Sequence, residues 1–209
     1  MASDPTLMTA AELFGAPEPP KRGRDRLLAI AIDLFYRNGF NSIGIENVIE
    51  EAGVSKTTFY KHFSSKSDLM VAAVKWRDRY EQRAWRRAVN LLAGDDPRRQ
   101  LRAFFEVMDR WFNEPDFRGC LFINAAAEFP NPNDPVHRAA AAHKRSHWQE
   151  TADMAKAAGA DDPEAFADAY MTLFEGALVM RQTHGRDDAA RMAMPMVDLL
   201  IERHLPSSP

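Results

Sequence analysis

The residues best suited to contact a ligand lie in one short stretch, GVSKTTFYKHFSSKSDL, from Gly53 to Leu69. It carries hydroxyl and ammonium side chains where a packing helix would carry ordinary solvating charges. Hydroxyl and ammonium groups donate hydrogen bonds to phosphate oxygens, and lysine also donates to the acceptor edge of guanine. The stretch therefore predicts a nucleic-acid contact through Lys56, Thr57, Thr58, Tyr60, Lys61 and His62.

A second candidate chemistry rests on Cys120, the single cysteine, as a nucleophile with His143 or His147 as its base. Nothing in the sequence brings such a base within hydrogen-bond reach, so an enzyme is the weaker alternative. One cysteine forms no intramolecular disulfide, and the six histidines are too scattered to give metal-ligand spacing. We therefore expect no metal and no cofactor.

Cys120 has two further interpretations. It follows Gly119 at an expected helix start, where the positive end of the helix dipole and Arg118 would lower the thiol pKa. That arrangement suits a sensor of oxidants or electrophiles. The Leu-Phe-Ile that follows predicts a buried position instead, and burial raises a thiol pKa. The burial argument favours a structural thiol.

The charges are distributed unevenly along the chain. The net charge is −3, yet residues 21–90 hold 14 Lys and Arg against 8 Asp and Glu, whereas the rest holds 13 against 22. A basic segment joined to an acidic remainder is typical of a polyanion-binding unit attached to a unit that binds something else. Helices of opposite charge that face each other would give the same counts.

The apolar residues recur at helical spacing, and no segment alternates with the period of two that a strand requires. Residues 1–20, which hold four of the thirteen prolines, predict a disordered leader. The expected all-α fold has a three-helix helix-turn-helix unit at 21–66, joined by a long fourth helix to a larger C-terminal helical bundle within 67–209. Helices are expected at 22–38, 45–52, 56–62, 66–94, 97–113, 118–129, 134–158, 163–184 and 187–204.

Residues 45–63 have the form of a helix-turn-helix, with Gly53 at a left-handed turn between two short helices. Together with FYRNGF at 35–40, AGVSK at 52–56, FYKHF at 59–63 and the Ser65-Lys66 and Leu69 that follow, the motif closely resembles the tetracycline-repressor (TetR) family of bacterial transcription regulators. The resemblance implies that 56–62 is the recognition helix, and that Thr58, Tyr60 and Lys66 contact phosphates. Many relatives carry a Ser or Thr pair before the second helix, so the Ile43-Gly44-Ile45 found here leaves its cap to Asn41 or Ser42.

The C-terminal part would, by this resemblance, bind an inducer and hold two chains together. Aromatic and methionine side chains are numerous enough to line a cavity, although such stripes also form plain cores. The ligand-binding candidates are Phe105, Met108, Trp111, Phe112, Cys120, Asn124, Trp148, Tyr170 and Phe174. The dimerisation candidates, which would also suit a monomeric core, are Ala169, Gly176, Ala177, Met196 and Leu200.

The resemblance thus implies a homodimeric, ligand-responsive transcription regulator, expected to be a repressor that a small apolar or aromatic inducer releases from a palindromic double-stranded DNA operator. A redox or electrophile sensor of the same fold and an architectural DNA binder are the other DNA-binding alternatives. No apolar run approaches the ~20 residues of a membrane span, and the first residues lack a signal-peptide pattern. A cytoplasmic location is therefore expected.

Overall fold

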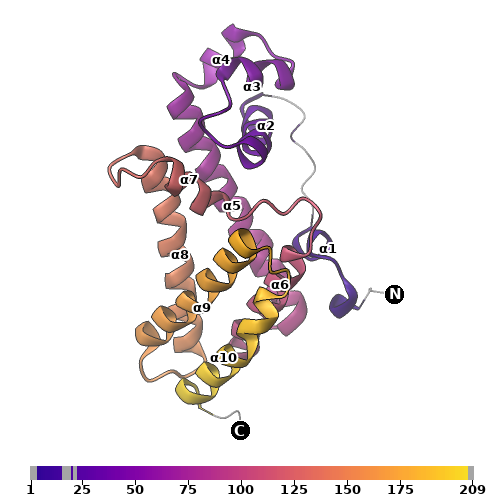
Figure 1. Cartoon of the computed structure of the whole chain (residues 1–209), viewed down its shortest axis with the longest axis vertical. Coiled ribbons are helices and arrows are strands. Elements are labelled where there is room, and N and C mark those ends of the chain that lie inside the picture. Colours follow the sequence, from indigo (N-terminus) through magenta and orange to yellow (C-terminus); the bar gives the residue numbers. More distant parts are fainter. Residues whose placement is uncertain (1–3, 16–19, 21–22, 207–209) are drawn as a thin grey trace. The chain divides into compact units, whose positions relative to one another are not determined.

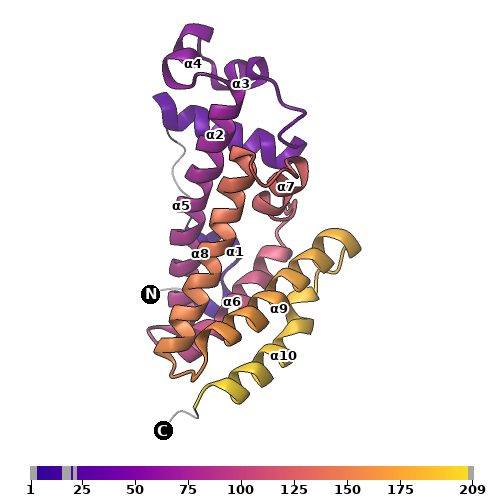
Figure 2. The same cartoon turned by 90° about the vertical axis from the view of Figure 1, so that its left-hand side faces the viewer.

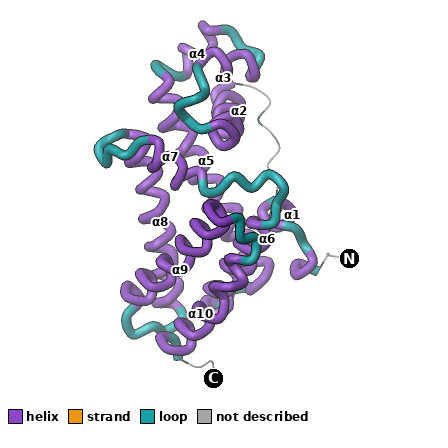
Figure 3. The backbone as a smooth tube through the Cα atoms, viewed as in Figure 1, coloured by secondary structure: helices purple, strands orange, loops and turns teal. Residues whose placement is uncertain are grey.

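A computed structural model describes residues 4–15, 20 and 23–206, and these residues form helices and loops without a strand (Figures 1 and 3). The all-α prediction is confirmed. In chain order the helices are the 3-10 helix η1 (Pro5–Leu7), α1 (Ala10–Phe14), α2 (Gly23–Asn38), α3 (Ile45–Ala52), α4 (Lys56–His62), α5 (Lys66–Ala93), α6 (Pro97–Phe112), α7 (Leu121–Glu128), α8 (Pro135–Ala157), α9 (Pro163–His184) and α10 (Ala189–His204).

The chain divides into two compact units, and two of the borders between them lie inside helices. One unit, here called the helix-turn-helix unit, comprises Pro17–Glu81 and Cys120–Lys144, and the other, the C-terminal unit, comprises Met1–Ala16, Gln82–Gly119 and Arg145–Pro209. Helices α5 and α8 therefore contribute to both units. Helix α7 belongs with the helix-turn-helix unit although it lies far from α2–α4 in sequence.

The core of the helix-turn-helix unit is built on the apolar face of α2, where Leu27, Leu28, Ala31 and Phe35 are buried. The helix ends at Gly39, whose φ of 86° is a left-handed conformation that glycine adopts without strain. Phe40 follows, fully buried, with its ring stacked on Phe35 at 4.8 Å. This packing fixes the turn that leads into α3.

The core of the C-terminal unit centres on α6. Asp96 caps the helix by accepting hydrogen bonds from the Arg98 and Arg99 amides, and Pro97 occupies the first turn. One face of α6 is buried throughout, from Leu101 to Phe112. Helices α9 and α10 run side by side against this core in both views (Figures 1 and 2).

The predicted disordered leader differs from the structure within residues 4–15. Thr9 and Glu12 form a reciprocal capping box that starts α1, and Ala10 and Leu13 are buried on the C-terminal unit. The Arg87 guanidinium donates to the Glu12 and Leu13 carbonyls at 3.0 and 2.6 Å, which satisfies the end of this five-residue helix. Residues 1–3 and 16–19 of the predicted leader lie outside the described residues.

Candidate nucleic-acid interface

The turn between α3 and α4 is formed by Gly53, with φ 60° and ψ 38°. Its amide donates to the Glu50 carbonyl, and the Val54 amide donates to the Ile49 carbonyl at 3.2 Å. These bonds close the end of α3 as in a Schellman motif, in which a left-handed residue lets the next amides reach back to the last turn. The chain therefore reverses within three residues and α4 begins at once.

Ser55 starts α4. Its hydroxyl accepts a hydrogen bond from the Thr58 amide at 3.1 Å, and its oxygen lies 2.9 Å from the Thr58 hydroxyl. A serine cap of this kind stabilises a helix by about 1 kcal/mol, which matters for a helix of seven residues. The predicted bounds of 56–62 match the helix observed.

The underside of α4 is buried. Phe59 and Phe63 are at most 1% exposed, and the small Ala52 of α3 is also fully buried. The Arg24 guanidinium lies over the Phe63 ring, 5.1 Å from its centroid. With the aromatic residues inside, the remaining side chains of α4 are left at or near the surface.

The outer face of α4 carries the predicted contact residues. Lys56, Thr57, Tyr60 and Lys61 are exposed, and Thr58 and His62 are partly exposed. The Tyr60 ring is 48% exposed and meets Phe59 edge-on at 5.3 Å, which supports the ring while its outer side faces solvent. The structure thus brings the six predicted α4 residues together on one short helix.

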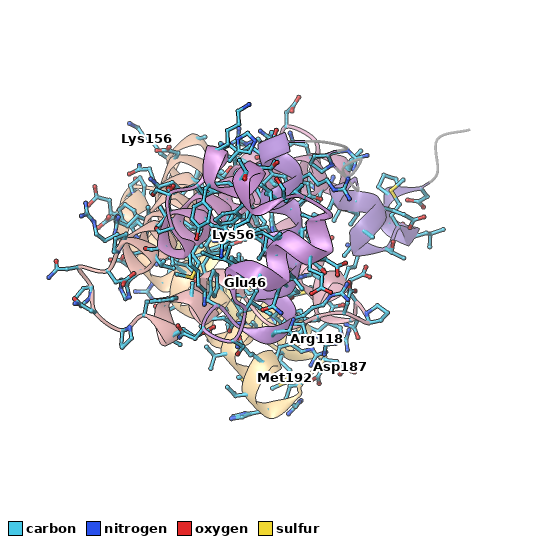
Figure 4. The ribbon with its side chains drawn as sticks, turned by 90° about the horizontal axis from the view of Figure 1, so that it is seen from above. Glu46, Lys56, Arg118, Lys156, Asp187 and Met192 are labelled. Atoms are coloured by element: carbon cyan, nitrogen blue, oxygen red, sulfur yellow. The ribbon has the colours of Figure 1, made fainter. Side chains whose placement is uncertain are left out.

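Lys56 has an acidic neighbour that the sequence did not single out. Its ammonium lies 3.7 Å from a carboxylate oxygen of Glu46 in the first turn of α3. Both residues are labelled in Figure 4. Both side chains are well exposed, and such a pair contributes at most about 1 kcal/mol in water. Lys56 can therefore exchange Glu46 for a phosphate at small cost.

Lys66, at the start of α5, is partly exposed and donates to the Asn41 carbonyl at 3.3 Å. The helix start itself is capped by Ser65, whose hydroxyl accepts from the Asp68 amide. The ammonium of Lys66 thus ties the first turn of α5 to the turn before α3. It lies outside the α4 cluster but belongs to the same unit.

The start of α3 is closed differently from the prediction. Neither Asn41 nor Ser42 caps the helix; Gly44 occupies the cap position without a side-chain cap bond, and Asn47 accepts from the Gly44 amide at 2.8 Å. This bond is the reverse half of a capping box, in which the third residue of the helix reaches back. The Asn47 at this spacing was the signal that the sequence offered.

The contact that Glu128 makes in this unit was not predicted from the sequence. Glu128 is the last residue of α7, and its two carboxylate oxygens accept hydrogen bonds from the Phe40 and Asn41 amides, each at 2.8 Å. The only signal in the sequence was a carboxylate at the end of a predicted helix, where the dipole disfavours a negative charge.

The ligand-binding candidates fall into both units. Five of the nine, Phe105, Met108, Phe112, Tyr170 and Phe174, are core residues of the C-terminal unit, at most 4% exposed. Trp111 and Trp148 of that unit are partly exposed, and the Trp148 ring nitrogen donates to Asp168 at 2.8 Å. Cys120 and Asn124 belong to the helix-turn-helix unit. A ligand contact for any of them stays a prediction.

The C-terminal unit has a surface pocket of about 580 Å³ between α5, α6 and α8. Its wall includes the ion pair between Arg86 and Glu150, 3.2 Å apart. Its lining includes both apolar and polar residues, which suits a molecule that has both kinds of surface. The lining, drawn from the described residues, is Arg86, Val89, Asn90, Pro97, Gln100, Phe104, Ser146, Gln149, Glu150, Asp153, Met154 and Ala157.

Helices α9 and α10 leave apolar side chains in solvent. Met192, Met196 and Leu199 of α10 are 46%, 53% and 56% exposed, and Val179 of α9 is 44% exposed. Spacings of four and three place the three α10 residues on one face of the helix. Gly176 of α9 is exposed as well, and a Cβ built there would meet no atom within 4 Å.

The other predicted dimerisation residues are less exposed than this face. Ala169 and Leu200 are partly exposed, whereas Ala177 is 4% exposed and packs inside its own chain. Their role in a dimer stays a prediction. The exposed apolar residues Val179, Met192, Met196 and Leu199 are hereafter called the α9–α10 face.

Cys120 is buried at the cap position of α7, without a side-chain cap bond. In the same unit His143 packs flat on Phe122, and its Nδ1 lies 2.8 Å from an Asp78 carboxylate oxygen. His147 belongs to the C-terminal unit, where its ring meets Phe104 and Phe174. Burial of the thiol agrees with the structural interpretation of Cys120.

Two searches cover the described part of the chain. Within residues 4–15, 20 and 23–206 there is no group of three or more His, Cys, Asp or Glu side chains arranged to hold a metal ion. Among the helices in this part, none is long and apolar enough to cross a membrane.

Two family profiles match the chain. The profile described as bacterial regulatory proteins, tetR family, matches residues 27–73, which include α3, the turn and α4. A second profile, the tetracyclin repressor-like C-terminal domain, matches residues 97–197. Both units are thus similar to parts of one family.

Individual relatives match over most of their length. The transcriptional regulator AcuR of Cereibacter sphaeroides is 29% identical over 82% of this chain and 87% of its own. The regulator YjdC of Escherichia coli is 24% identical over 81% and 91%. A solved TetR-family transcriptional regulator from Streptomyces coelicolor is 31% identical, with a TM-score of 0.75 over 86% of this chain and 94% of that one.

Proposed function

We propose, because this chain belongs to the TetR family of bacterial transcription regulators and has the DNA-binding helix-turn-helix of that family, that it acts as a homodimeric repressor released from its operator by a small inducer. The observation that carries the proposal is the outer face of α4. Hydroxyl, ammonium and imidazole groups gather there over a fully buried aromatic underside. Such a face can enter the major groove while the underside holds it rigid.

The α9–α10 face supports the dimer. Large exposed apolar side chains in contiguous patches are unusual on a monomer, and four of them lie on two adjacent helices here. Two chains paired by a two-fold axis would cover this face with its own copy. A two-fold dimer presents two copies of α4, which read half-sites about 34 Å apart on a palindromic operator.

The pocket between α5, α6 and α8 supports the inducer. Val89, Phe104 and Met154 offer apolar surface, and Asn90 and Gln100 offer hydrogen-bond partners. An aromatic or apolar molecule with one or two polar groups fits these walls better than a hydrocarbon. Binding that favours one arrangement of α5 and α8, both of which continue into the helix-turn-helix unit, would lower operator affinity.

The test is selection of duplexes from a random DNA library by the purified chain, followed by footprinting and a salt series. We expect a palindrome to be enriched and its affinity to fall steeply with salt, by about 0.9 log units per log unit of salt for each phosphate neutralised. Lys61→Ala should weaken binding and relax the preference at one or two base pairs. Lys75→Ala, an exposed lysine on α5, is the matched control.

Two results would contradict the proposal. If no sequence is enriched above non-specific DNA, the chain has no operator. If Lys61→Ala and the control bind the selected duplex equally well, α4 does not read the bases. Release of the selected DNA by compounds from a small-molecule library would then separate an inducible repressor from an architectural DNA binder.

A further inference from the structure

Glu128 holds the turn that precedes α3. Its carboxylate accepts the Phe40 and Asn41 amides, one on each oxygen, at 2.8 Å. These amides point from the turn at residues 39–41, before the helix-turn-helix begins. Hydrogen bonds to a charged acceptor are stronger than hydrogen bonds between neutral groups. One side chain of α7 therefore binds two backbone amides of the turn that leads into α3.

The position of this carboxylate is unfavourable for α7 itself. Glu128 is the last residue of the helix, where exposed carbonyls give the helix its negative end. Helix stability alone would favour a cation or a neutral residue there. The hydrogen bonds to the turn offset that cost. They therefore explain why a glutamate stands at this position.

The turn is shaped to receive the carboxylate. Gly39 has φ 86°, and a Cβ built on it would lie 3.1 Å from Glu128 Oε1. A side chain at residue 39 would thus be strained in its backbone and crowd the carboxylate oxygen. Glycine at 39 thus leaves room for the carboxylate of Glu128.

Further bonds extend the contact on both sides. Lys66 at the start of α5 donates to the Asn41 carbonyl, and Phe129, next after Glu128, meets the buried Phe40 ring edge-on at 6.1 Å. The His137 ring of α8 donates to the Phe129 carbonyl at 2.7 Å. The turn is thereby connected to α5, α7 and α8 within one compact unit.

We propose that Glu128 is a positioning residue for DNA binding, whose carboxylate sets the place of the turn 39–41 and transmits movement of α7 to α3 and Lys66. This inference rests on the proposed function, since it names a residue through which that function is regulated. Glu128 touches neither DNA nor inducer in this proposal. It acts through the backbone that it holds.

The direction of the expected change in DNA affinity distinguishes a positioning role of Glu128 from the effect of its negative charge alone. Glu128→Gln removes one negative charge from a DNA-binding unit, which by long-range electrostatics alone would raise affinity for DNA. It also replaces one acceptor by an amide donor that faces a backbone amide, so one of the two bonds is lost. A fall in affinity therefore cannot come from the change in charge, and it indicates the lost hydrogen bond.

The experiment compares the full-length chain with Glu128→Gln, Glu128→Asp and Glu51→Gln on a duplex selected by the unmodified protein. Glu51 is exposed on α3, so its variant repeats the charge change without touching the turn. We expect both Glu128 variants to bind the duplex about tenfold more weakly, a usual size for coupling between sites. Glu51→Gln should bind as tightly or more tightly. Glu128→Asp keeps the charge but is too short to reach both amides.

A second readout distinguishes positioning from loss of stability. The buried thiol of Cys120 lies at the other end of α7 and reports the opening of that helix by its alkylation rate. Because coupling is reciprocal, the selected duplex should slow alkylation in the unmodified chain and leave the rate unchanged in Glu128→Gln. Hydrogen exchange at the Phe40 and Asn41 amides should accelerate in both Glu128 variants.

The outcomes are separable. If the unmodified chain selects no duplex, the proposed function fails. If it selects one and the Glu128 variants bind it like Glu51→Gln, the positioning role is wrong while the proposed function stands. Weaker binding with an unchanged response of Cys120 alkylation to DNA would also overturn the role, because α7 would then respond to DNA without Glu128.

Discussion

Tyr170 shows how one buried polar atom constrains the core of the C-terminal unit. Its ring is fully buried against Phe105 and Phe166, and its hydroxyl donates to the Leu101 carbonyl at 2.6 Å. Burial raises the pKa of this hydroxyl well above its usual range, because the charged form would lose its hydration. The bond joins α9 to the first turns of α6.

Tyr170→Phe should lower the free energy of unfolding by about 1 kcal/mol at neutral pH, the usual net contribution of a hydrogen bond. Above pH ~10 the unfolded chain releases this proton while the folded chain keeps it, so the unmodified protein loses stability as pH rises. The difference in free energy of unfolding between the unmodified protein and Tyr170→Phe, here called the gap, should therefore narrow and then change sign as the pH rises. Urea unfolding at neutral pH and at pH ~11 measures it; a gap independent of pH would contradict a buried, neutral hydroxyl.

At the scale of elements, most helices were predictable because each carries its own boundary signals. Gly53 and Ser55 mark the turn and the cap at the start of α4, and Asp96 with Pro97 starts α6. All of these signals are local in the sequence. Helix α7 is shorter than its predicted 118–129 and begins at Leu121, since Gly119 has φ 86° and Cys120 is the cap.

Helix α1 and the role of Glu128 depend instead on residues far away in sequence. The five-residue α1 is held by Arg87, 74 residues from Leu13, and Glu128 acts on amides about 87 positions earlier. Every residue except proline has a backbone amide, so the residue types do not show which amide a distant side chain will bind. A short helix without its partner is unstable. Periodicity and capping rules therefore could not find either contact.

The docking of α1 gives a prediction with an internal control. Leu13 is fully buried and Leu7 is 84% exposed, so the same substitution tests both environments. Leu13→Ala should lower the free energy of unfolding by about 2–4 kcal/mol, as expected when buried methyl groups are removed, whereas Leu7→Ala should change little. Urea unfolding followed by tryptophan fluorescence suits the test, because Phe14 meets the Trp85 ring at 5.4 Å. Equal effects would show that α1 is undocked in solution.

At the scale of the whole molecule, the exposed α9–α10 face bears on the state in which the protein works. A dimer that buries this face would remove from water the side chains of Val179, Met192, Met196 and Leu199, which a monomer leaves in solvent. Operator binding would then depend on protein concentration, since each half-site alone contributes only part of the binding free energy.

Gly176→Glu tests this dimer at an exposed position of α9, where a Cβ added to Gly176 would meet no atom of another turn or helix within 4 Å. We expect monomers that keep their helicity and bind the selected duplex poorly, since a carboxylate in a two-fold contact meets its own copy. Sedimentation and circular dichroism measure the two properties. Leu91→Glu, which alters a 39% exposed leucine of α5, is the control and should remain dimeric. A monomeric unmodified chain would contradict the dimer.

Two of the borders between the units, at residues 81/82 and 144/145, lie within α5 and α8. A continuous helix fixes rotation as well as distance: one added residue turns everything beyond it by about 100° and advances it by about 1.5 Å. When a unit is exchanged between relatives, the residues on both sides of the junction must therefore keep their rotational positions around the helix axis. A chimera joined within α5 must keep the residue count of both parents or differ from it by whole turns, about seven residues for two turns. Recombination that ignores this count would rotate one part of α5 about the helix axis relative to the other.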